Sequence, residues 1–168
     1  MGMFKFIKEA GEKLFGIGKA KAAESSPAAA AAPTPDQVAE LNRTAAEAIA
    51  RYIETMKLEV EGLSVQYDGA TETVTVAGIA ADQPTREKVV LCCGNVASVA
   101  QVNDLMTVAT PEPESQMYTV VRGDNLSKIS KQFYGTPNKY MLIFEANKPM
   151  LNHPDKIYPG QVLRIPPQ

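Results

Sequence analysis

The sequence has few of the residues from which enzyme active sites are usually built. Its 168 residues include no tryptophan and a single histidine, His153, which lies in a polar loop bounded by proline. Without a second histidine we expect neither a histidine-based metal site nor a catalytic triad. We therefore interpret His153 as a solvated surface residue.

Motifs for other cofactors and ions are also missing. The chain has no G-x-x-x-x-G-K-S/T loop, no strand followed by G-x-G-x-x-G, and no Asp-x-Asp-x-Asp-Gly loop for calcium. The two cysteines, Cys92 and Cys93, are adjacent, and neighbouring cysteines rarely bridge each other. We interpret them as small core residues in a reducing compartment, with a reactive thiol as the less favoured alternative. The sequence thus predicts a binding module and not an enzyme.

Long apolar runs are absent too. No stretch approaches the ~20 apolar residues that a membrane-spanning helix needs, and charges interrupt every candidate signal-peptide core. Phe6 stands where a myristoylation motif needs serine or threonine. The formal net charge of -2 gives no reason to expect nucleic acid as a partner. We expect a cytoplasmic protein without a transmembrane segment, and a monomer.

Residues 1–18 are predicted to form an amphipathic helical segment. Up to Lys21 the chain has five lysines against two glutamates. Such a helix would either lie on an anionic membrane or dock onto the protein's own next domain, and we favour docking because the glutamates dilute the cationic face. One face collects its apolar and small residues at helical spacing: Phe4, Ile7, Gly11 and Leu14.

The Ala/Pro-rich residues 19–35 have no apolar face to bury, and we interpret them as a tether. Thr34 and Gln37 then form a Thr-x-x-Gln capping box at the start of a domain predicted over residues 36–108. The elements expected in this domain are a helix to about residue 58, strands over 63–67 and 73–76, a helix over 82–93 capped by Asp82 or Thr85, and a strand over 99–108.

The α-β-β-α-β order of this domain, with the stretch TVTVAGIAADQPTREKVVLCCGNVASVAQVNDLM, resembles the BON domain. The matching residues are Thr75-Val76-Ala77-Gly78 in a strand and Gly94 to Val99 in a helix-to-strand turn. A linker over residues 109–117 follows, and its prolines favour an extended connection.

Residues 118–167 are predicted to form a second domain of β-α-α-β order. Asn125 is expected to cap the first helix, Gly135 to end it, and the strand over 162–165 to pair with the strand over 119–121. The segments YTVVRGDNLSKISKQFYG, IFEANK and IYPGQVLRIP resemble the LysM family, whose members bind N-acetylglucosamine polymers such as peptidoglycan or chitin. The fold class is therefore α+β, with two small domains.

Taken together, the N-terminal MGMFKFIKEAGEKL segment, the BON-like domain and the LysM-like domain resemble the cytoplasmic bacterial potassium-binding proteins of the BON-LysM type. The Ala/Pro-rich insertion departs from that pattern. The resemblance implies selective binding and sensing of K⁺, with compaction on binding. K⁺ is well served by neutral carbonyl oxygens, so its site requires no carboxylate cluster. By residue-to-residue match, the implied ligands are the main-chain oxygens of Ile7, Ala10, Glu12, Gly94, Val96 and Val99.

Two other functions remain open. The protein could be an interaction scaffold at a membrane surface, with the N-terminal segment as anchor and a protein partner on the LysM-like domain. It could instead bind peptidoglycan through the LysM-like domain, although the missing signal peptide argues against this. The expected lining of that glycan groove is Gly123, Asp124, Asn125 and Leu126 on one side, and Asn147, Met150, Ile157 and Tyr158 on the other.

Overall fold

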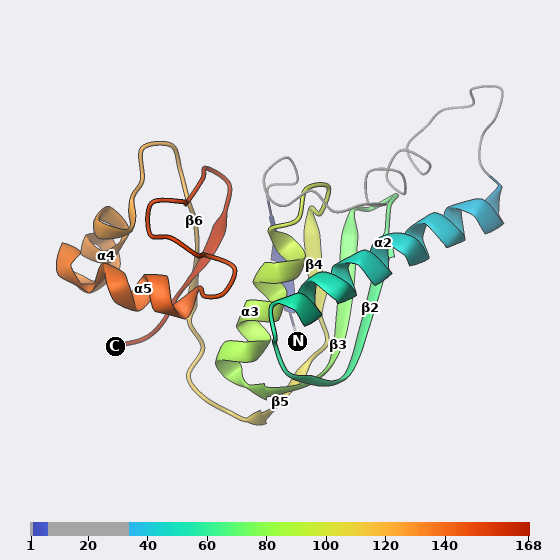
Figure 1. Ribbon diagram of the computed structural model, residues 1–168, viewed down its shortest axis with the longest axis horizontal. Coiled ribbons are helices and arrows are strands. Elements are labelled where there is room, and N and C mark those ends of the chain that lie inside the picture. The colour runs from blue at the N-terminus through green and yellow to red at the C-terminus, as the bar shows by residue number, and fades with distance from the viewer. Residues whose placement is uncertain (1, 7–33) are drawn as a thin grey trace.

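The computed structural model describes residues 2–6 and 34–168, which fold into two α+β domains lying against each other (Figure 1). We refer to residues 2–6 and 34–110 as the N-terminal domain and to residues 116–168 as the C-terminal domain. None of the helices in the described ranges is long and apolar enough to cross a membrane.

The N-terminal domain is a sheet with two helices on one face (Figure 1). The strand order is β1-β4-β3-β2, and β5 also pairs with β3. β2 is antiparallel to β3, whereas β4 and β5 both run parallel to β3. Its elements are β1 (Gly2–Lys5), α2 (Pro35–Thr55), β2 (Val60–Asp68), β3 (Thr73–Asp82), α3 (Gln83–Gly94), β4 (Gln101–Asp104) and β5 (Thr107–Thr110).

Both helices start where the sequence indicates. The Thr34 hydroxyl accepts from the Gln37 amide at 3.3 Å, and the Gln37 side chain accepts from the Thr34 amide at 2.8 Å, which completes the predicted capping box. The Asp82 carboxylate accepts from the Thr85 amide at 2.8 Å and caps α3. From α2 to β4 the elements follow the predicted α-β-β-α-β order, with β1 before them and β5 after them, while assignment to the BON domain stays a prediction.

The prediction of a helix at the N-terminus is wrong for residues 2–5. Residues Gly2–Lys5 form a strand that pairs antiparallel with β4, and are not the start of a helix. Phe4 is half-buried, while Met3 and Lys5 on either side of it are exposed. The edge of β4 supplies partners for the backbone of these residues, a non-local contribution that spacing along the chain does not show. The rest of the predicted helix, with Ile7, Ala10 and Glu12, and the tether up to residue 33 lie outside the described residues.

The prediction of a single strand over residues 99–108 is also wrong. The structure has two strands in this part of the chain, β4 and β5. The break lies at Asp104, whose carboxylate accepts from the Met106 amide at 2.9 Å. This local side-chain bond competes with regular strand pairing. On β3, Gly78 has a φ of 140°, so the backbone also departs from regular strand geometry there. β4 and β5 therefore pair with separate parts of β3.

The C-terminal domain has the predicted β-α-α-β order. Asn125 caps α4 through the Lys128 amide at 2.8 Å, and Gly135, with a φ of 75°, ends that helix. β6 and β7 pair antiparallel as expected, although β6 ends at Thr119 and includes the last residues of the predicted linker. The elements are β6 (Gln116–Thr119), α4 (Leu126–Tyr134), the 3₁₀ turn η1 (Pro137–Lys139), α5 (Tyr140–Ala146) and β7 (Val162–Ile165).

Each domain has its own apolar core. In the N-terminal domain Ile49 and Ile53 of α2 belong to the same core cluster as Val74 and Val76 of β3, and all four are fully buried. Cys92 and Cys93 of α3 lie in the same core, which confirms their interpretation as buried residues. In the C-terminal domain β7 lies between α5 and α3 of the neighbouring domain (Figure 1). This strand therefore brings the two domains into contact.

Candidate functional site

The connection from α3 to β4, residues 94–100, forms a compact turn that we call the carbonyl turn. The Asn95 amide donates to the Leu91 carbonyl at 2.9 Å and closes the last turn of α3. The Val99 amide then donates to the Val96 carbonyl at 3.2 Å. The Val96 and Val99 side chains are fully buried in the core. The backbone of the turn is thus anchored by its own side chains.

Gly94 allows the chain that follows β1 to approach this turn closely. A β-carbon at residue 94 would overlap the ring of Phe6, so only glycine leaves room for that ring. The Phe6 amide also donates to the carbonyl of Ala100 at 2.9 Å. The described N-terminal strand therefore reaches the carbonyl turn at Phe6, one residue before Ile7 in the sequence.

A tyrosine holds the turn from the sheet side. The Tyr67 hydroxyl donates to the Ser98 carbonyl at 3.0 Å, and Ser98 has a φ of 73°, which is uncommon for a residue other than glycine. Burial of the Tyr67 ring, with the nearby carboxylates of Glu72 and Asp68, raises the pKa of Tyr67 to about 12. Because the hydroxyl keeps its proton at neutral pH, it remains a donor to the turn.

Three of the six ligands implied by the resemblance lie in the carbonyl turn: Gly94, Val96 and Val99. The other three, Ile7, Ala10 and Glu12, lie outside the described residues. The turn follows the C-terminal end of α3, where unpaired helix carbonyls carry a partial negative charge. Within residues 2–6 and 34–168, no three histidine, cysteine or acidic side chains gather to form a metal site.

Asn95 was not among the predicted site residues, although it lies between Gly94 and Val96. Its side-chain amide donates to the Val162 carbonyl at 2.8 Å, and its side-chain oxygen accepts from the Val162 amide at 2.8 Å. Val162 begins β7 of the C-terminal domain. The carbonyl turn is thus bonded directly to the other domain, a contact for which the sequence carries no local signal.

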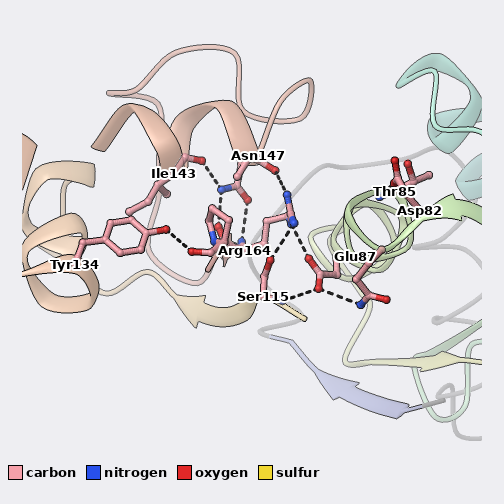
Figure 2. A network of polar contacts seen from close by, with 11 residues as sticks. Asp82, Thr85, Glu87, Ser115, Tyr134, Ile143, Asn147 and Arg164 are labelled. Carbon is pink, nitrogen blue, oxygen red and sulfur yellow. Dashed lines mark hydrogen bonds and ion pairs between the residues drawn. The ribbon is translucent and has the colours of Figure 1, made fainter. Parts of the chain in front are cut away.

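A buried ion pair holds the same two domains together further along β7. The Arg164 Nε atom lies 2.8 Å from a Glu87 carboxylate oxygen, and both side chains are about 5% exposed (6% and 5%). Ser115 accepts from Arg164 at 2.9 Å, and its amide donates to Glu87 at 2.7 Å (Figure 2). Gln83 also donates to Glu87, at 3.1 Å. We call the contact made by Asn95, Glu87 and their partners the domain seam.

The charges at this seam favour an ionised Glu87. Burial opposes the charge on its carboxylate, but hydrogen bonds from Ser115 and Gln83, together with the charge of Arg164, hold the pKa of Glu87 below its ordinary value of 4.5. The guanidinium of Arg164 also donates to the Ala146 carbonyl at 3.2 Å. The network is satisfied on both sides, as a buried ion pair requires if it is not to be destabilising.

The residues expected to line a glycan groove differ in burial, and two of them are buried. Leu126 is 2% exposed and belongs to the domain core. Asn147 is also 2% exposed, and its amide bonds to Ile143 and to the backbone of Arg164 (Figure 2). Leu126 therefore packs in the core and Asn147 bonds within the domain, so neither side chain is available to a glycan.

The other groove residues divide between the surface and the seam. Gly123 and Asn125 are exposed, and Asp124 accepts from the Tyr118 hydroxyl at 2.7 Å. Ile157 packs partly buried against the C-terminal core. Met150 packs against the core of the N-terminal domain. Together with Tyr158, Tyr52 and Asn95, Met150 lines a cavity of about 220 Å³ between the domains. One side of the predicted groove thus faces the N-terminal domain.

His153 lies on the surface, as expected. Its side chain is 56% exposed, and its Nδ1 atom accepts from the Asp155 amide at 3.1 Å within the same loop. Burial raises the pKa of the Cys92 thiol to about 12 and raises the pKa of the Cys93 thiol well above its ordinary value. Neither thiol is therefore activated as a nucleophile at neutral pH.

The family model described as "LysM domain" matches residues 118–166. Potassium binding protein Kbp of Escherichia coli O6:H1 (strain CFT073) is 42% identical over 167 residues, which cover 99% of each chain. An uncharacterized protein of Deinococcus radiodurans is 48% identical over 50 residues, covering 30% of this chain and 19% of that protein. With similarity to the Escherichia coli protein over nearly its whole length, and with a LysM domain at its C-terminus, the chain belongs to the family of potassium binding protein Kbp.

Proposed function

We propose that the protein binds K⁺ selectively in the bacterial cytoplasm and acts as a sensor of its concentration. The observation that carries this proposal is the 42% identity, over 99% of both chains, to a protein named for potassium binding. A relative that matches one domain only would not support transfer of a site built from both ends of the chain. The proposed role is that of a binding protein and not of an enzyme.

The proposed ligands are main-chain oxygens of the carbonyl turn, at Gly94, Val96 and Val99, joined by those of Ile7, Ala10 and Glu12. A large, weakly hydrated cation is well matched by neutral carbonyl dipoles. The end of α3 adds the negative pole of a helix dipole at the same place. The fixed backbone of the turn, held by Tyr67 and by two buried valines, favours a preformed half of the site.

The second half of the proposed site lies in the chain after β1. Phe6 is anchored to the turn by its ring on Gly94 and its hydrogen bond to Ala100. A ligand that binds one conformation more tightly shifts the population toward it. K⁺ that bridges the two segments would therefore favour the closed form and compact the protein.

Calorimetry tests the proposal. The dialysed, Na⁺-exchanged protein is titrated with KCl at constant ionic strength, and the same titration with NaCl serves as the control. The proposal predicts saturable heat with KCl and none with NaCl. Equal signals from both salts, or no signal from either, would contradict it. Small-angle scattering with and without K⁺ then tests compaction, for which a smaller radius of gyration in K⁺ is expected.

Carbohydrate binding is a second candidate, favoured by the LysM match over residues 118–166. Leu126 and Asn147 are buried and do not contribute to such a surface. Gly123 and Asn125 at the start of α4 are exposed, and Asp124, Ile157 and Tyr158 are partly exposed. Co-sedimentation with insoluble peptidoglycan or chitin tests this function. Retention of the protein in the pellet at low salt and at high salt would support it.

A further inference from the structure

We propose that Asn95 is the positioning residue through which docking of the C-terminal domain sets the K⁺ affinity of the carbonyl turn. This inference rests on the proposed function, since it concerns the same site. It adds a residue whose side chain bonds to the C-terminal domain and whose backbone lies between two proposed ligands.

The geometry around Asn95 leaves its peptide unit little freedom. Its main-chain amide donates to Leu91 at 2.9 Å, so the residue closes α3. Both polar atoms of its side chain bond to Val162, each at 2.8 Å. The side chain therefore completes the edge of β7 as a neighbouring strand would. The Gly94 carbonyl shares a planar peptide unit with the Asn95 amide, so its direction follows from how Asn95 is held. The Val96 carbonyl belongs to the next but one peptide unit, so Asn95 positions it through Val96.

Val162, the partner of Asn95, lies in β7, and the backbone of this strand is itself held in place. β7 pairs with β6 on one side. Two residues further along, Arg164 bonds through its amide and carbonyl to the side chain of Asn147, each at 2.9 Å. The side chains of Asn95 and Asn147 thus make the same pair of hydrogen bonds to alternate residues of β7. Asn147 does so from within the C-terminal domain, and Asn95 from the other domain.

The Val162 and Arg164 amides can therefore be compared within a single protein. The Val162 amide is bonded across the seam to the carbonyl turn, whereas the Arg164 amide is bonded within its own domain. If K⁺ stabilises the turn, and the turn holds Val162, then K⁺ must protect the Val162 amide from hydrogen exchange. Linkage is reciprocal, so the contact that K⁺ strengthens must also strengthen K⁺ binding.

The first measurement uses the unaltered protein. Amide exchange at Val162 and Arg164 is followed by NMR with KCl and with NaCl at equal ionic strength. We expect K⁺ to slow exchange at Val162 by about fivefold or more relative to Arg164, in line with the usual size of coupling between sites. An equal effect of K⁺ on both amides, or no effect on Val162, would overturn the proposal.

The second measurement uses variants. N95A should weaken K⁺ binding by about five- to tenfold in the calorimetric titration. S115A is the matched control, because the Ser115 hydroxyl accepts from Arg164 at the same seam, whereas the Asn95 side chain bonds to Val162. We expect S115A to change the K⁺ affinity less than twofold. Equal losses in both variants would assign the effect to a loosened seam and overturn the role of Asn95.

The outcomes separate this inference from the proposed function. If the unaltered protein does not bind K⁺, the proposed function fails and this inference fails with it. If the unaltered protein binds K⁺ but N95A binds equally well, only the positioning role is rejected. Circular dichroism of N95A checks that the variant is folded, and the exchange measurement on the unaltered protein decides the matter if it is not.

Discussion

The ring of Phe6 lies in the space that a β-carbon on Gly94 would occupy. Gly94 is the last residue of α3, and Phe6 is the last described residue before the segment that carries three proposed ligands. This contact joins two parts of the chain that are far apart in sequence. It therefore indicates which substitutions should disturb the contact between the N-terminal segment and the carbonyl turn.

Gly94→Ala should displace the Phe6 ring and weaken K⁺ binding. Overpacking of a filled site typically costs about 1–3 kcal/mol, so the urea midpoint should fall as well. We expect at least a tenfold loss of K⁺ affinity by calorimetry, because the second half of the site could no longer dock.

Phe6→Ala provides the control for that prediction, since it removes the ring that the new methyl group would meet. In the Phe6→Ala background, the addition of Gly94→Ala should cost much less stability than in the natural protein. Additive losses of stability in the double variant would show that the two residues do not meet.

Tyr67→Phe should loosen the carbonyl turn without emptying the core. It removes the hydroxyl that donates to Ser98 at 3.0 Å and keeps the buried ring. The expected loss of stability is about 0.5–1.5 kcal/mol, the usual net value of one hydrogen bond. K⁺ affinity should fall by a few-fold. A variant with natural K⁺ affinity would show that the turn does not depend on this bond.

Arg164→Met should destabilise the domain seam strongly, because it leaves the Glu87 carboxylate buried without its partner. Removing one member of a buried ion pair costs about 3–5 kcal/mol. The double variant Glu87→Gln/Arg164→Met should recover part of the loss, since no charge remains unpaired. Urea unfolding measures both, and a double variant no more stable than Arg164→Met would contradict this account of the seam.

The seam should also weaken in acid. The pKa of Glu87 in the folded protein lies below its ordinary value of 4.5. A depressed pKa contributes stability that is fully present above the ordinary value and is lost as the pH falls through the folded value. The difference in unfolding free energy between the natural protein and Glu87→Gln should thus be constant from about pH 7 to pH 5 and shrink below pH 4.5. A difference that stays constant down to pH 3 would argue against an ionised Glu87.

Cys92 and Cys93 should react slowly with thiol reagents in the native protein. Both are buried, and burial raises the pKa of Cys92 to about 12, so almost no thiolate is present at neutral pH. Reaction with dithionitrobenzoate should need opening of the C-terminal end of α3, and K⁺ should slow it further. Rapid labelling of either thiol without denaturant would contradict the assigned burial.

Much of the fold could be predicted because its signals are local. The Thr34-Gln37 capping box, the Asp82 and Asn125 caps and Gly135 at the end of α4 all act within a few residues, and each is found where expected. The strand at Gly2–Lys5 could not be predicted in this way, because its partner is β4, about a hundred residues away in the chain.

The same difference between local signals and distant contacts applies to the candidate site. Gly94, Val96 and Val99 follow from a resemblance that covers the whole chain, and in the structure they lie in one turn. Asn95 lies between Gly94 and Val96 but was missed, because its partner Val162 belongs to the other domain. Glu87 and Arg164 were also missed, since each looks like an ordinary surface charge in its own element. A buried contact between domains leaves no periodic pattern in either sequence segment.

The most direct test of the account is the position of the ion itself. Tl⁺ resembles K⁺ in size and weak hydration and scatters anomalously, so crystals grown with Tl⁺ in place of K⁺ would locate the site. We expect one anomalous peak within ligating distance of the main-chain oxygens of Gly94, Val96 and Val99, with the segment from Ile7 to Glu12 completing the shell. A peak elsewhere in the molecule, or none at the carbonyl turn, would contradict it.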